Sequence, residues 1–202
     1  MKFFSVVIVL AVLMSGCGSG PKLPPLSADA VILAFGDSLT AGTGASAETS
    51  YPAVLNRLSG RKVINAGVPG ETTAGGIARL EETLEREKPV MVILCLGGND
   101  FLQRLDQEKA EQNIRAMVSK IRERGVAVVL IGVPRIGFGL EVPEWYGKVA
   151  KDNKIPYEGK VLAKILGDSS LKSDAVHPNA AGYERLAIGI DSLLKKSGAL
   201  PQ

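Results

Sequence analysis

Three side chains in this sequence could together perform nucleophilic catalysis: Ser38, Asp174 and His177. A serine hydroxyl is a weak nucleophile near neutral pH and needs a base within hydrogen-bonding distance to remove its proton. His177 is the single histidine of the chain, and it suits that role because the unperturbed pKa of imidazole is about 6.5. Asp174, three residues earlier, can accept the Nδ1 proton and stabilise the imidazolium as it forms. The pattern predicts acyl transfer through Ser38, with His177 as the base.

Ser38 follows an apolar segment, Val31–Phe35, through the motif Gly36-Asp37-Ser38-Leu39. An uninterrupted apolar run bounded by glycine is typical of a strand buried on both faces of a parallel sheet. In open α/β sheets ligands bind beyond the carboxyl ends of the strands, which is where this serine would emerge. Alternatively, Ser38 is a turn residue that caps the next helix, and His177 is an exposed or capping residue.

Two further predicted strands, at residues 61–65 and 90–96, end in loops of glycine and polar residues. Because the carboxyl ends of parallel strands share one edge of the sheet, three such loops would face one pocket. Acyl transfer needs hydrogen-bond donors aimed at the developing oxyanion. Gly70 can offer a backbone N–H that no side chain obstructs, and Asn99 can offer its side-chain amide. Each could instead be an ordinary turn or cap residue.

Strand-like apolar runs alternate with helical periodicity along the rest of the chain. A fourth strand is predicted at 126–131 and a short, weakly marked fifth near 155–157. We predict helices at residues 51–58, 77–84, 110–121, 144–154 and 178–194. The last of these begins at Pro178, because proline suits the first position of a helix. This alternation is typical of a parallel sheet covered by helices on both faces. We therefore expect one three-layer α/β/α domain.

Length and composition limit the possible functions. The 202 residues have room for one domain with a full core. The 24 lysines and arginines against 21 aspartates and glutamates give a charge of +3 without a dense basic run, which gives nucleic-acid binding little support. The hydrophobic content of 46% excludes disorder for most of the chain. Cys95 lies in the third predicted strand and is expected to be an inert core residue.

Residues 1–16 differ from the rest of the chain. Lys2 precedes an apolar run that is too short for a membrane span and is typical of a secretory signal. The segment Leu13-Met14-Ser15-Gly16-Cys17 resembles the bacterial lipobox, in which the cysteine is lipidated and becomes the mature N-terminus. We therefore expect a lipoprotein signal peptide and a lipidated Cys17. A plain secretory signal and an uncleaved N-terminal anchor are the alternatives.

The segment after Cys17 is rich in glycine, proline and serine. We expect residues 17–28 to form the lipidated residue and a flexible tether, and residues 29–202 to form the domain. The protein would then lie in the bacterial cell envelope, facing the periplasm or the exterior. Gly18 is not a retention signal of the aspartate type, which favours the outer membrane in a Gram-negative host.

Four motifs of this chain resemble, in the same order, the four sequence blocks of the GDSL or SGNH hydrolases: Gly36-Asp37-Ser38-Leu39, the Gly70 loop, Gly98-Asn99-Asp100 and Asp174-x-x-His177. The spacing and the context of Asn65–Thr72 are most similar to the bacterial thioesterase I/lysophospholipase L1/arylesterase branch. The resemblance covers roughly Ala30–Leu194, which is nearly all of the predicted domain.

The resemblance implies that Ser38 is the nucleophile, His177 the base and Asp174 its partner. It also implies an oxyanion hole made of the Ser38 N–H, the Gly70 N–H and the Asn99 side chain. The fold it implies is flavodoxin-like, with a five-stranded parallel sheet of order 2-1-3-4-5. No metal or cofactor is implied.

Several apolar residues in or beside the predicted loops could line a groove for an acyl or aryl group: Phe101, Leu102, Phe138, Leu140 and Trp145. They could equally fold back onto the core. The segment Arg135–Trp145 departs from the branch named above, and this leaves the preferred acyl chain open.

The sequence thus predicts a hydrolase of carboxylic esters or thioesters, such as aryl esters, acyl thioesters or lysophospholipids, acting through an acyl-serine intermediate. One alternative is a carbohydrate O-acetyl esterase of the cell envelope. Another is a lipoprotein that uses this fold to bind a ligand without catalysis, although a pure binder needs no base beside a serine. The expected partners are a small ester, thioester or lipid substrate and, through Cys17, the membrane.

Overall fold

The computed structural model describes residues 20–137 and 139–202. The predicted signal peptide, Cys17 and Phe138 lie outside the described residues. A central parallel sheet has the strand order β2-β1-β3-β4-β5, and its strands are β1 Val31–Gly36, β2 Lys62–Gly67, β3 Met91–Cys95, β4 Ala127–Ile131 and β5 Tyr157–Glu158. The predicted strand order is confirmed.

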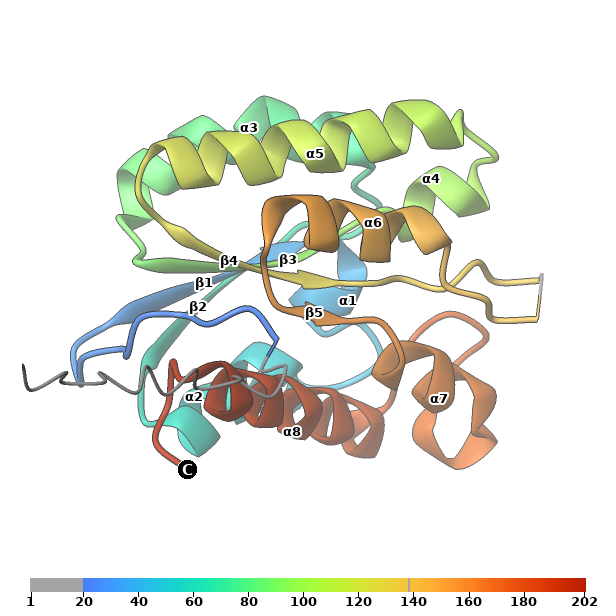
Figure 1. Ribbon diagram of the computed structural model, residues 1–202. Coiled ribbons are helices and arrows are strands. Elements are labelled where there is room, and N and C mark those ends of the chain that lie inside the picture. Colours follow the sequence, from blue (N-terminus) through green and yellow to red (C-terminus); the bar gives the residue numbers. More distant parts are fainter. Residues whose placement is uncertain (1–19, 138) are drawn as a thin grey trace, which may run out of the picture.

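Helices cover both faces of the sheet. On one face α3 packs against α5 and α5 against α6, while on the other α8 packs against α2 and α7; Figure 1 shows these two layers above and below the strands. The helices are α1 Ser38–Ala41, α2 Tyr51–Ser59, α3 Thr73–Glu87, α4 Gly98–Leu102, α5 Gln107–Glu123, α6 Glu144–Asn153, α7 Val161–Gly167 and α8 Ala180–Ser197, with short 3-10 turns at Ala47–Thr49 and Ser169–Leu171. The predicted three-layer α/β/α fold is confirmed.

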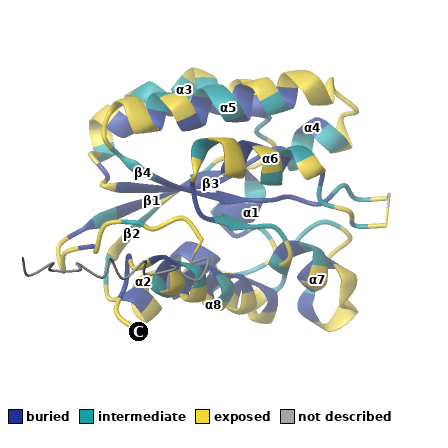
Figure 2. Cartoon of the chain, in the orientation of Figure 1, coloured by how far each residue is buried: buried dark blue, intermediate teal, exposed yellow. Residues whose placement is uncertain are grey.

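The core follows the apolar runs of the sequence. Every residue of β3 is buried, as are five of the six residues of β1, and these strands form the dark centre of Figure 2. The edge strand β2 is only partly buried. Cys95 is buried and free, which agrees with the expectation that it is a core residue.

The register of the sheet aligns the carboxyl ends of three strands. Gly36 at the end of β1 pairs with Gly67 at the end of β2 and with Cys95 at the end of β3. The loops that follow these strands therefore start at the same edge of the sheet. This alignment of the strand ends is what the prediction of a shared pocket assumed.

Three short helices, α1, α4 and α7, were not predicted, because they are too short to show helical periodicity. The predicted start of the last helix at Pro178 was wrong. Asn179 is the N-cap of α8, its side chain accepts a hydrogen bond from the Gly182 N–H, and Pro178 pairs in a β-bridge with Lys172. Asparagine is among the best helix caps, and here it sets the boundary.

Part of the predicted tether is packed onto the domain. The Leu23 N–H donates to Ser197 O at 2.8 Å and the Leu26 N–H to Ala199 O at 2.9 Å, and the Leu26 side chain is buried in the core. The domain therefore begins near Leu23 rather than at Asp29. Leu23 and Leu26 are the two leucines of this Pro-rich segment, and they supply the apolar contacts.

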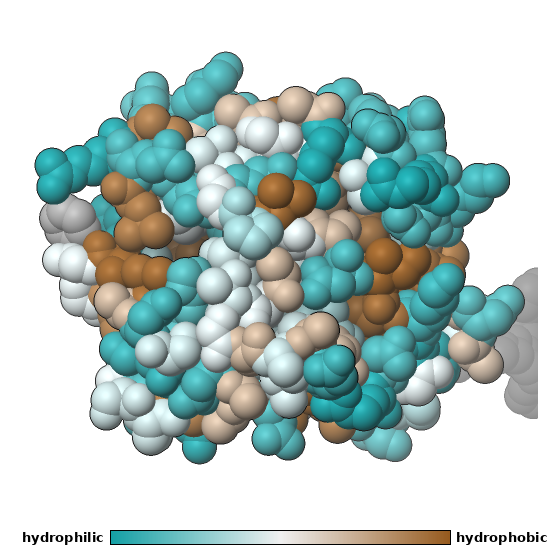
Figure 3. Space-filling view, turned by 180° about the vertical axis from the view of Figure 1, so that it is seen from behind, coloured by the Kyte–Doolittle hydropathy of each residue, from teal (hydrophilic) through white to brown (hydrophobic). Residues whose placement is uncertain are grey.

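The face seen from behind in Figure 3 carries many hydrophilic side chains and a few separate apolar areas. In the described part of the chain, six large hydrophobic side chains are exposed: Leu58, Val68, Val90, Leu102, Leu105 and Ile188. Of the helices in the described part of the chain, none has the length and apolar character needed to cross a bilayer.

Candidate active site

Ser38 is the first residue of α1, directly after the end of β1. The preceding Asp37 caps this helix, because its Oδ1 accepts a hydrogen bond from the Leu39 N–H at 3.0 Å. Helix α1 therefore begins directly at the end of the strand, where Ser38 is partly exposed. The serine predicted to be the nucleophile thus lies at the junction between β1 and the capped start of α1.

His177 and Asp174 lie together in the loop that precedes α8. Asp174 Oδ1 accepts hydrogen bonds from the backbone N–H groups of Val176 and His177, both at 2.8 Å. Asp174 Oδ2 lies 2.8 Å from His177 Nδ1, and this hydrogen bond is the main cause of a pKa for Asp174 below its usual value. The carboxylate therefore fixes the loop and the imidazole at the same time.

The imidazole faces the serine. His177 Nε2 lies 3.1 Å from Ser38 Oγ, a normal hydrogen-bond distance. Because Asp174 occupies Nδ1, the tautomer with its proton on Nδ1 leaves Nε2 free to accept the proton of the Ser38 hydroxyl. Serine, histidine and aspartate are thus connected in one chain of hydrogen bonds, in the arrangement that activates a nucleophile.

Gly70 lies in the loop after β2 and has a φ of +82°, in the left-handed region that favours glycine. Within the described residues, neither the Gly70 N–H nor the Ser38 N–H donates a hydrogen bond to a protein acceptor. Both residues line the same cavity. Two of the three predicted oxyanion donors therefore belong to residues in the cavity wall and have no competing partner in the described chain.

Asn99, the third predicted donor, is the second residue of α4. Its Nδ2 donates to the backbone carbonyl of Glu71 at 2.9 Å and lies 3.4 Å from Asp37 Oδ2. Because both neighbours are acceptors, they determine which end of the side-chain amide carries the nitrogen. The amide nitrogen of Asn99 thereby lies between the loop that carries Gly70 and the Asp37 carboxyl group.

A buried hydrogen-bond network fixes α4 to the start of α3. Asp100 accepts hydrogen bonds from the Thr73 N–H at 2.9 Å and from Thr73 Oγ1 at 2.6 Å. Asn113 of α5 in turn donates to Thr73 Oγ1 at 3.1 Å. Buried polar groups that are all paired rigidify their surroundings, so the backbone that carries Asn99 has little freedom.

Asp37 is a carboxyl group with an unusual environment. Its residue is 1% exposed, and burial raises its pKa to about 7 from 3.8. The Leu39 N–H opposes this rise, while the nearby carboxylates of Glu71 and Asp100 add to it. Asp37 therefore changes its charge near neutral pH beside the Asn99 amide.

A cavity of about 260 Å³ lies where the predicted residues meet, although Asp174 is not part of its wall. Ser38, Gly70, Asn99 and His177 all line it. Its remaining walls are mainly apolar and include residues that were not predicted to line the site: Leu39, Thr43, Pro69, Val133, Pro134, Ile136, Leu166 and Val176. Two of these residues could have been found from the sequence. Val133 lies two residues after the fourth strand, and Val176 is next to His177.

Of the residues expected to form the substrate groove, Leu102 lines this cavity. Phe101 and Trp145 instead pack against one another, with ring centroids 6.4 Å apart, because α4 turns Phe101 toward α6. Phe101 also lines a neighbouring hollow of about 260 Å³ that shares Ile136 with the site. Leu140 does not line the cavity, and Phe138 lies outside the described residues.

A larger hollow of about 590 Å³ lies between α6, β5 and the end of α8. It is lined by Lys151, Lys154 and Lys196 together with apolar residues, and neither Ser38 nor His177 borders it. Within residues 20–137 and 139–202 there is also no group of three histidine, cysteine or carboxylate side chains that could hold a metal ion. The candidate catalytic residues Ser38 and His177 therefore line the smaller cavity and not the larger hollow.

The sequence model of the GDSL-like lipase/acylhydrolase family matches residues 34–185, which is more than half of the chain. The chain belongs to this family. The family resemblance inferred from the four sequence motifs is therefore confirmed. The match spans the segment from β1 into α8 and includes both Ser38 and His177.

Individual relatives agree with the GDSL family membership. Esterase TesA of Pseudomonas aeruginosa is 33% identical over 198 residues, which cover 92% of this chain and 98% of that protein. Thioesterase 1/protease 1/lysophospholipase L1 of Escherichia coli is 31% identical over 156 residues, covering 73% of this chain and 75% of that protein.

The fold is also shared with a solved esterase. The crystal structure of the psychrotrophic esterase EstA from Pseudoalteromonas sp., inhibited by monoethylphosphonate, is similar with a TM-score of 0.73 at 26% identity. The similarity covers 83% of this chain and 98% of that chain. This GDSL-family protein thus shares its architecture with that esterase.

Proposed function

We propose that this GDSL-family protein hydrolyses carboxylic esters or thioesters through a covalent acyl-serine intermediate on Ser38. The observation that carries the proposal is the 3.1 Å contact between Ser38 Oγ and His177 Nε2 at the wall of a cavity. The family membership and the names of the two relatives, an esterase and a thioesterase/lysophospholipase, support the same reaction class.

In the first half of the reaction, Ser38 Oγ attacks the carbonyl carbon of the substrate while His177 Nε2 takes the hydroxyl proton. Asp174 stabilises the imidazolium that forms. The negative charge on the carbonyl oxygen is met by the N–H groups of Ser38 and Gly70 and by the Asn99 amide. Such donors contribute strongly because they are already oriented before the charge develops.

The tetrahedral intermediate then collapses, and His177 returns the proton to the leaving alcohol or thiol. A water molecule enters, His177 removes its proton, and the resulting nucleophile attacks the acyl-serine carbonyl. The same donors stabilise the second oxyanion. Breakdown of this intermediate releases the carboxylic acid and restores the Ser38 hydroxyl with a proton from His177.

The apolar walls of the cavity favour an acyl or aryl group as the part of the substrate that binds there. A carbohydrate ester is less suited to this cavity, because buried sugar hydroxyls need hydrogen-bond partners. A purely binding role would leave the serine, base and carboxylate arrangement without a use. We therefore favour simple esters, acyl thioesters or lysophospholipids over the two alternatives considered from the sequence.

The direct test is hydrolysis of p-nitrophenyl butyrate by the wild-type protein, Ser38→Ala and a matched control, Ser119→Ala. Ser119 is an exposed serine on α5, away from the cavity. We expect Ser38→Ala to abolish turnover and labelling by a fluorophosphonate probe, and Ser119→Ala to retain both. Turnover by Ser38→Ala equal to that of the control would refute the assignment.

We also propose that Cys17 carries a lipid that anchors the domain to a bacterial envelope membrane, with residues 1–16 removed as a signal peptide. The support is the lipobox-like segment before Cys17. Metabolic labelling with a fatty-acid analogue should mark the wild-type chain and leave Cys17→Ala unlabelled. Equal labelling of both chains would contradict the anchor, and fractionation of a labelled Gram-negative host would distinguish the inner from the outer membrane.

A further inference from the structure

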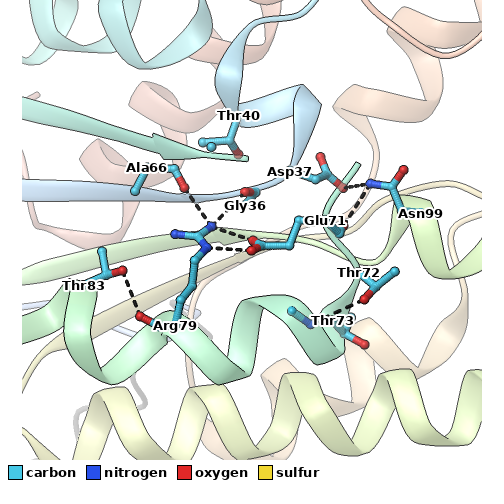
Figure 4. A network of polar contacts seen from close by, with 12 residues as sticks. Gly36, Asp37, Thr40, Ala66, Glu71, Thr72, Thr73, Arg79, Thr83 and Asn99 are labelled. Carbon is cyan, nitrogen blue, oxygen red and sulfur yellow. Dashed lines mark hydrogen bonds and ion pairs between the residues drawn. The ribbon is translucent and has the colours of Figure 1, made fainter. Parts of the chain in front are cut away.

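Arg79 of α3 contacts three different segments at the carboxyl edge of the sheet (Figure 4). Its Nη2 donates to the carbonyl of Gly36 at 3.2 Å, at the end of β1, and to the carbonyl of Ala66 at 2.9 Å, the residue before the last in β2. Its Nε and Nη2 donate to the two carboxylate oxygens of Glu71 at 2.7 and 2.6 Å. One guanidinium thus ties two strand ends to the loop after β2.

The Arg79–Glu71 ion pair is largely shielded from water. The side chain of Glu71 is 8% exposed and that of Arg79 is 23% exposed. The guanidinium carbon also lies 3.9 Å above the centre of the Phe35 ring. A two-pronged pair in such surroundings has a defined geometry, because both side chains lose their alternative partners in water.

Each segment that Arg79 contacts carries one of the proposed oxyanion donors or adjoins one. Gly36 lies two residues before Ser38, and Glu71 directly follows Gly70. The backbone carbonyl of Glu71 also accepts the 2.9 Å hydrogen bond from Asn99 Nδ2. The position of Glu71 therefore affects the Gly70 N–H through the chain and the Asn99 amide through a hydrogen bond.

We propose that Arg79 and Glu71 form a positioning pair that holds the Ser38 N–H, the Gly70 N–H and the Asn99 amide in one fixed arrangement around the oxyanion. The inference rests on the esterase function proposed above and extends it to two residues outside the cavity wall. Neither side chain lines the cavity, so both act through the donors and not on the substrate.

The arrangement requires arginine in particular. The planar guanidinium presents several N–H groups in a fixed arrangement, whereas a lysine ammonium is one compact charge on a flexible chain. Lysine therefore cannot bind both oxygens of Glu71 and the two backbone carbonyls at the same time. Arg79→Lys therefore keeps the charge but loses the fixed geometry. A displacement of about 1 Å in a catalytic group can lower the rate about 10²-fold, and loss of one oxyanion donor costs about 10²–10³-fold.

The test measures kcat and KM for p-nitrophenyl butyrate with Arg79→Lys and Glu71→Gln. The matched control is Arg115→Lys on α5, because Arg115 also pairs with two carboxylates, Glu111 at 2.8 Å and Asp152 at 3.0 Å, outside the cavity. We expect Arg79→Lys to lower kcat by about 10- to 100-fold with KM changed less than about threefold. Arg115→Lys should match the wild type in both constants.

Glu71→Gln keeps one oxygen for Arg79 and should lower kcat less, in the same direction. The double variant should lose little more than Arg79→Lys alone, since the two residues act as one unit. If Arg79→Lys does not fold, Glu71→Gln tests the positioning role in its place. A kcat of Glu71→Gln below that of Arg115→Lys would support the role, and an equal kcat would contradict it.

Two results would overturn the inference, and they can be told apart. If wild-type turnover depends on Ser38 but Arg79→Lys and Glu71→Gln keep the kcat of the control, the positioning role is wrong and the esterase function stands. If the wild-type protein shows no Ser38-dependent turnover, the esterase function fails, and the inference fails with it.

Discussion

Asp174 holds His177 through both of its carboxylate oxygens. Oδ1 accepts the backbone N–H of His177 and Oδ2 lies 2.8 Å from the ring nitrogen Nδ1. The backbone contact fixes the position of the histidine backbone, and the ring contact fixes how the imidazole is turned. Together they direct Nε2 toward Ser38, 139 residues away in the sequence.

Replacing Asp174 with asparagine should separate these two roles. In Asp174→Asn the side-chain oxygen can still accept the backbone N–H groups, but the new amide nitrogen faces Nδ1 of His177. Because that nitrogen is a donor, it favours the wrong imidazole tautomer.

For Asp174→Asn we expect kcat for p-nitrophenyl butyrate to fall by about 10²–10⁴-fold, while the thermal midpoint changes little. Asp168→Asn is a suitable control, because Asp168 also accepts a backbone N–H in a turn, from Ser170, but does not contact His177. Equal kcat values for the two variants would show that the Asp174 carboxylate is not needed for turnover.

Gly70→Ala should impair catalysis more than folding. The left-handed φ of +82° strains any residue with a Cβ, by about 1–2 kcal/mol, although no atom lies within 4 Å of the added carbon. Relief of that strain would move the Gly70 N–H away from the oxyanion. We expect kcat to fall at least about 10-fold.

Gly60→Ala provides a control with the same strain. Gly60 has a φ of +62° at the end of α2 and likewise has no atom within 4 Å of an added Cβ. A similar loss of stability in both variants, measured by urea unfolding, should be accompanied by a loss of kcat only in Gly70→Ala. Equal kcat values would remove Gly70 from the proposed oxyanion hole.

The stability of the protein should depend on pH through Asp37. Its pKa is raised from 3.8 to about 7 in the folded state, mainly by burial, so the folded protein binds this proton more tightly than the unfolded chain. The free energy of unfolding contributed by Asp37 must therefore decrease as pH rises from about 4 to about 7, and level off above that.

Asp37→Asn removes this titration and keeps an oxygen for the Leu39 N–H. We expect the difference in free energy of unfolding, wild type minus Asp37→Asn, to fall steadily between about pH 4 and pH 7. Urea unfolding at several pH values measures it, and taking the difference removes the contribution of all other carboxylates. A difference that is constant over this range would contradict the raised pKa.

The apolar wall of the cavity should set the preferred acyl length. Leu102 of α4 is 50% exposed and lines the cavity, so Leu102→Trp can fill the cavity without disturbing the core. We expect the ratio of kcat/KM for p-nitrophenyl octanoate to that for the acetate to fall about 10-fold. Ile188→Trp, at an equally exposed position on α8, should leave the ratio unchanged.

An unchanged ratio in Leu102→Trp would mean that the acyl chain does not bind along this wall. The neighbouring hollow lined by Phe101 and Ile136 would then be the next surface to probe. The corresponding substitution is Ile136→Trp, assayed with the same pair of esters.

Local pattern in the sequence predicted the alternation of strands and helices and pointed to Ser38, Asp174 and His177 as candidate catalytic residues, while the strand order came from the family resemblance. The buried run of β1 leading into Ser38, and Asp174 three residues before His177, are short-range features that hydrophobic periodicity and side-chain chemistry reveal directly. The boundaries were less accurate where a side-chain cap decides them, as Asn179 does for α8. The packing of Leu23 and Leu26 against the chain end was also missed, since it joins the two ends of the described chain.

The tertiary structure decided what surrounds those groups. Phe101 and Trp145 were expected at the groove but pack together, while Leu166 and Val176 form its wall, because the surroundings of each side chain depend on segments that are far apart in the sequence. The same holds for Arg79, which carries no local signal of function in its helix. Only the register that aligns the ends of β1 and β2 places Gly36, Ala66 and Glu71 around one guanidinium.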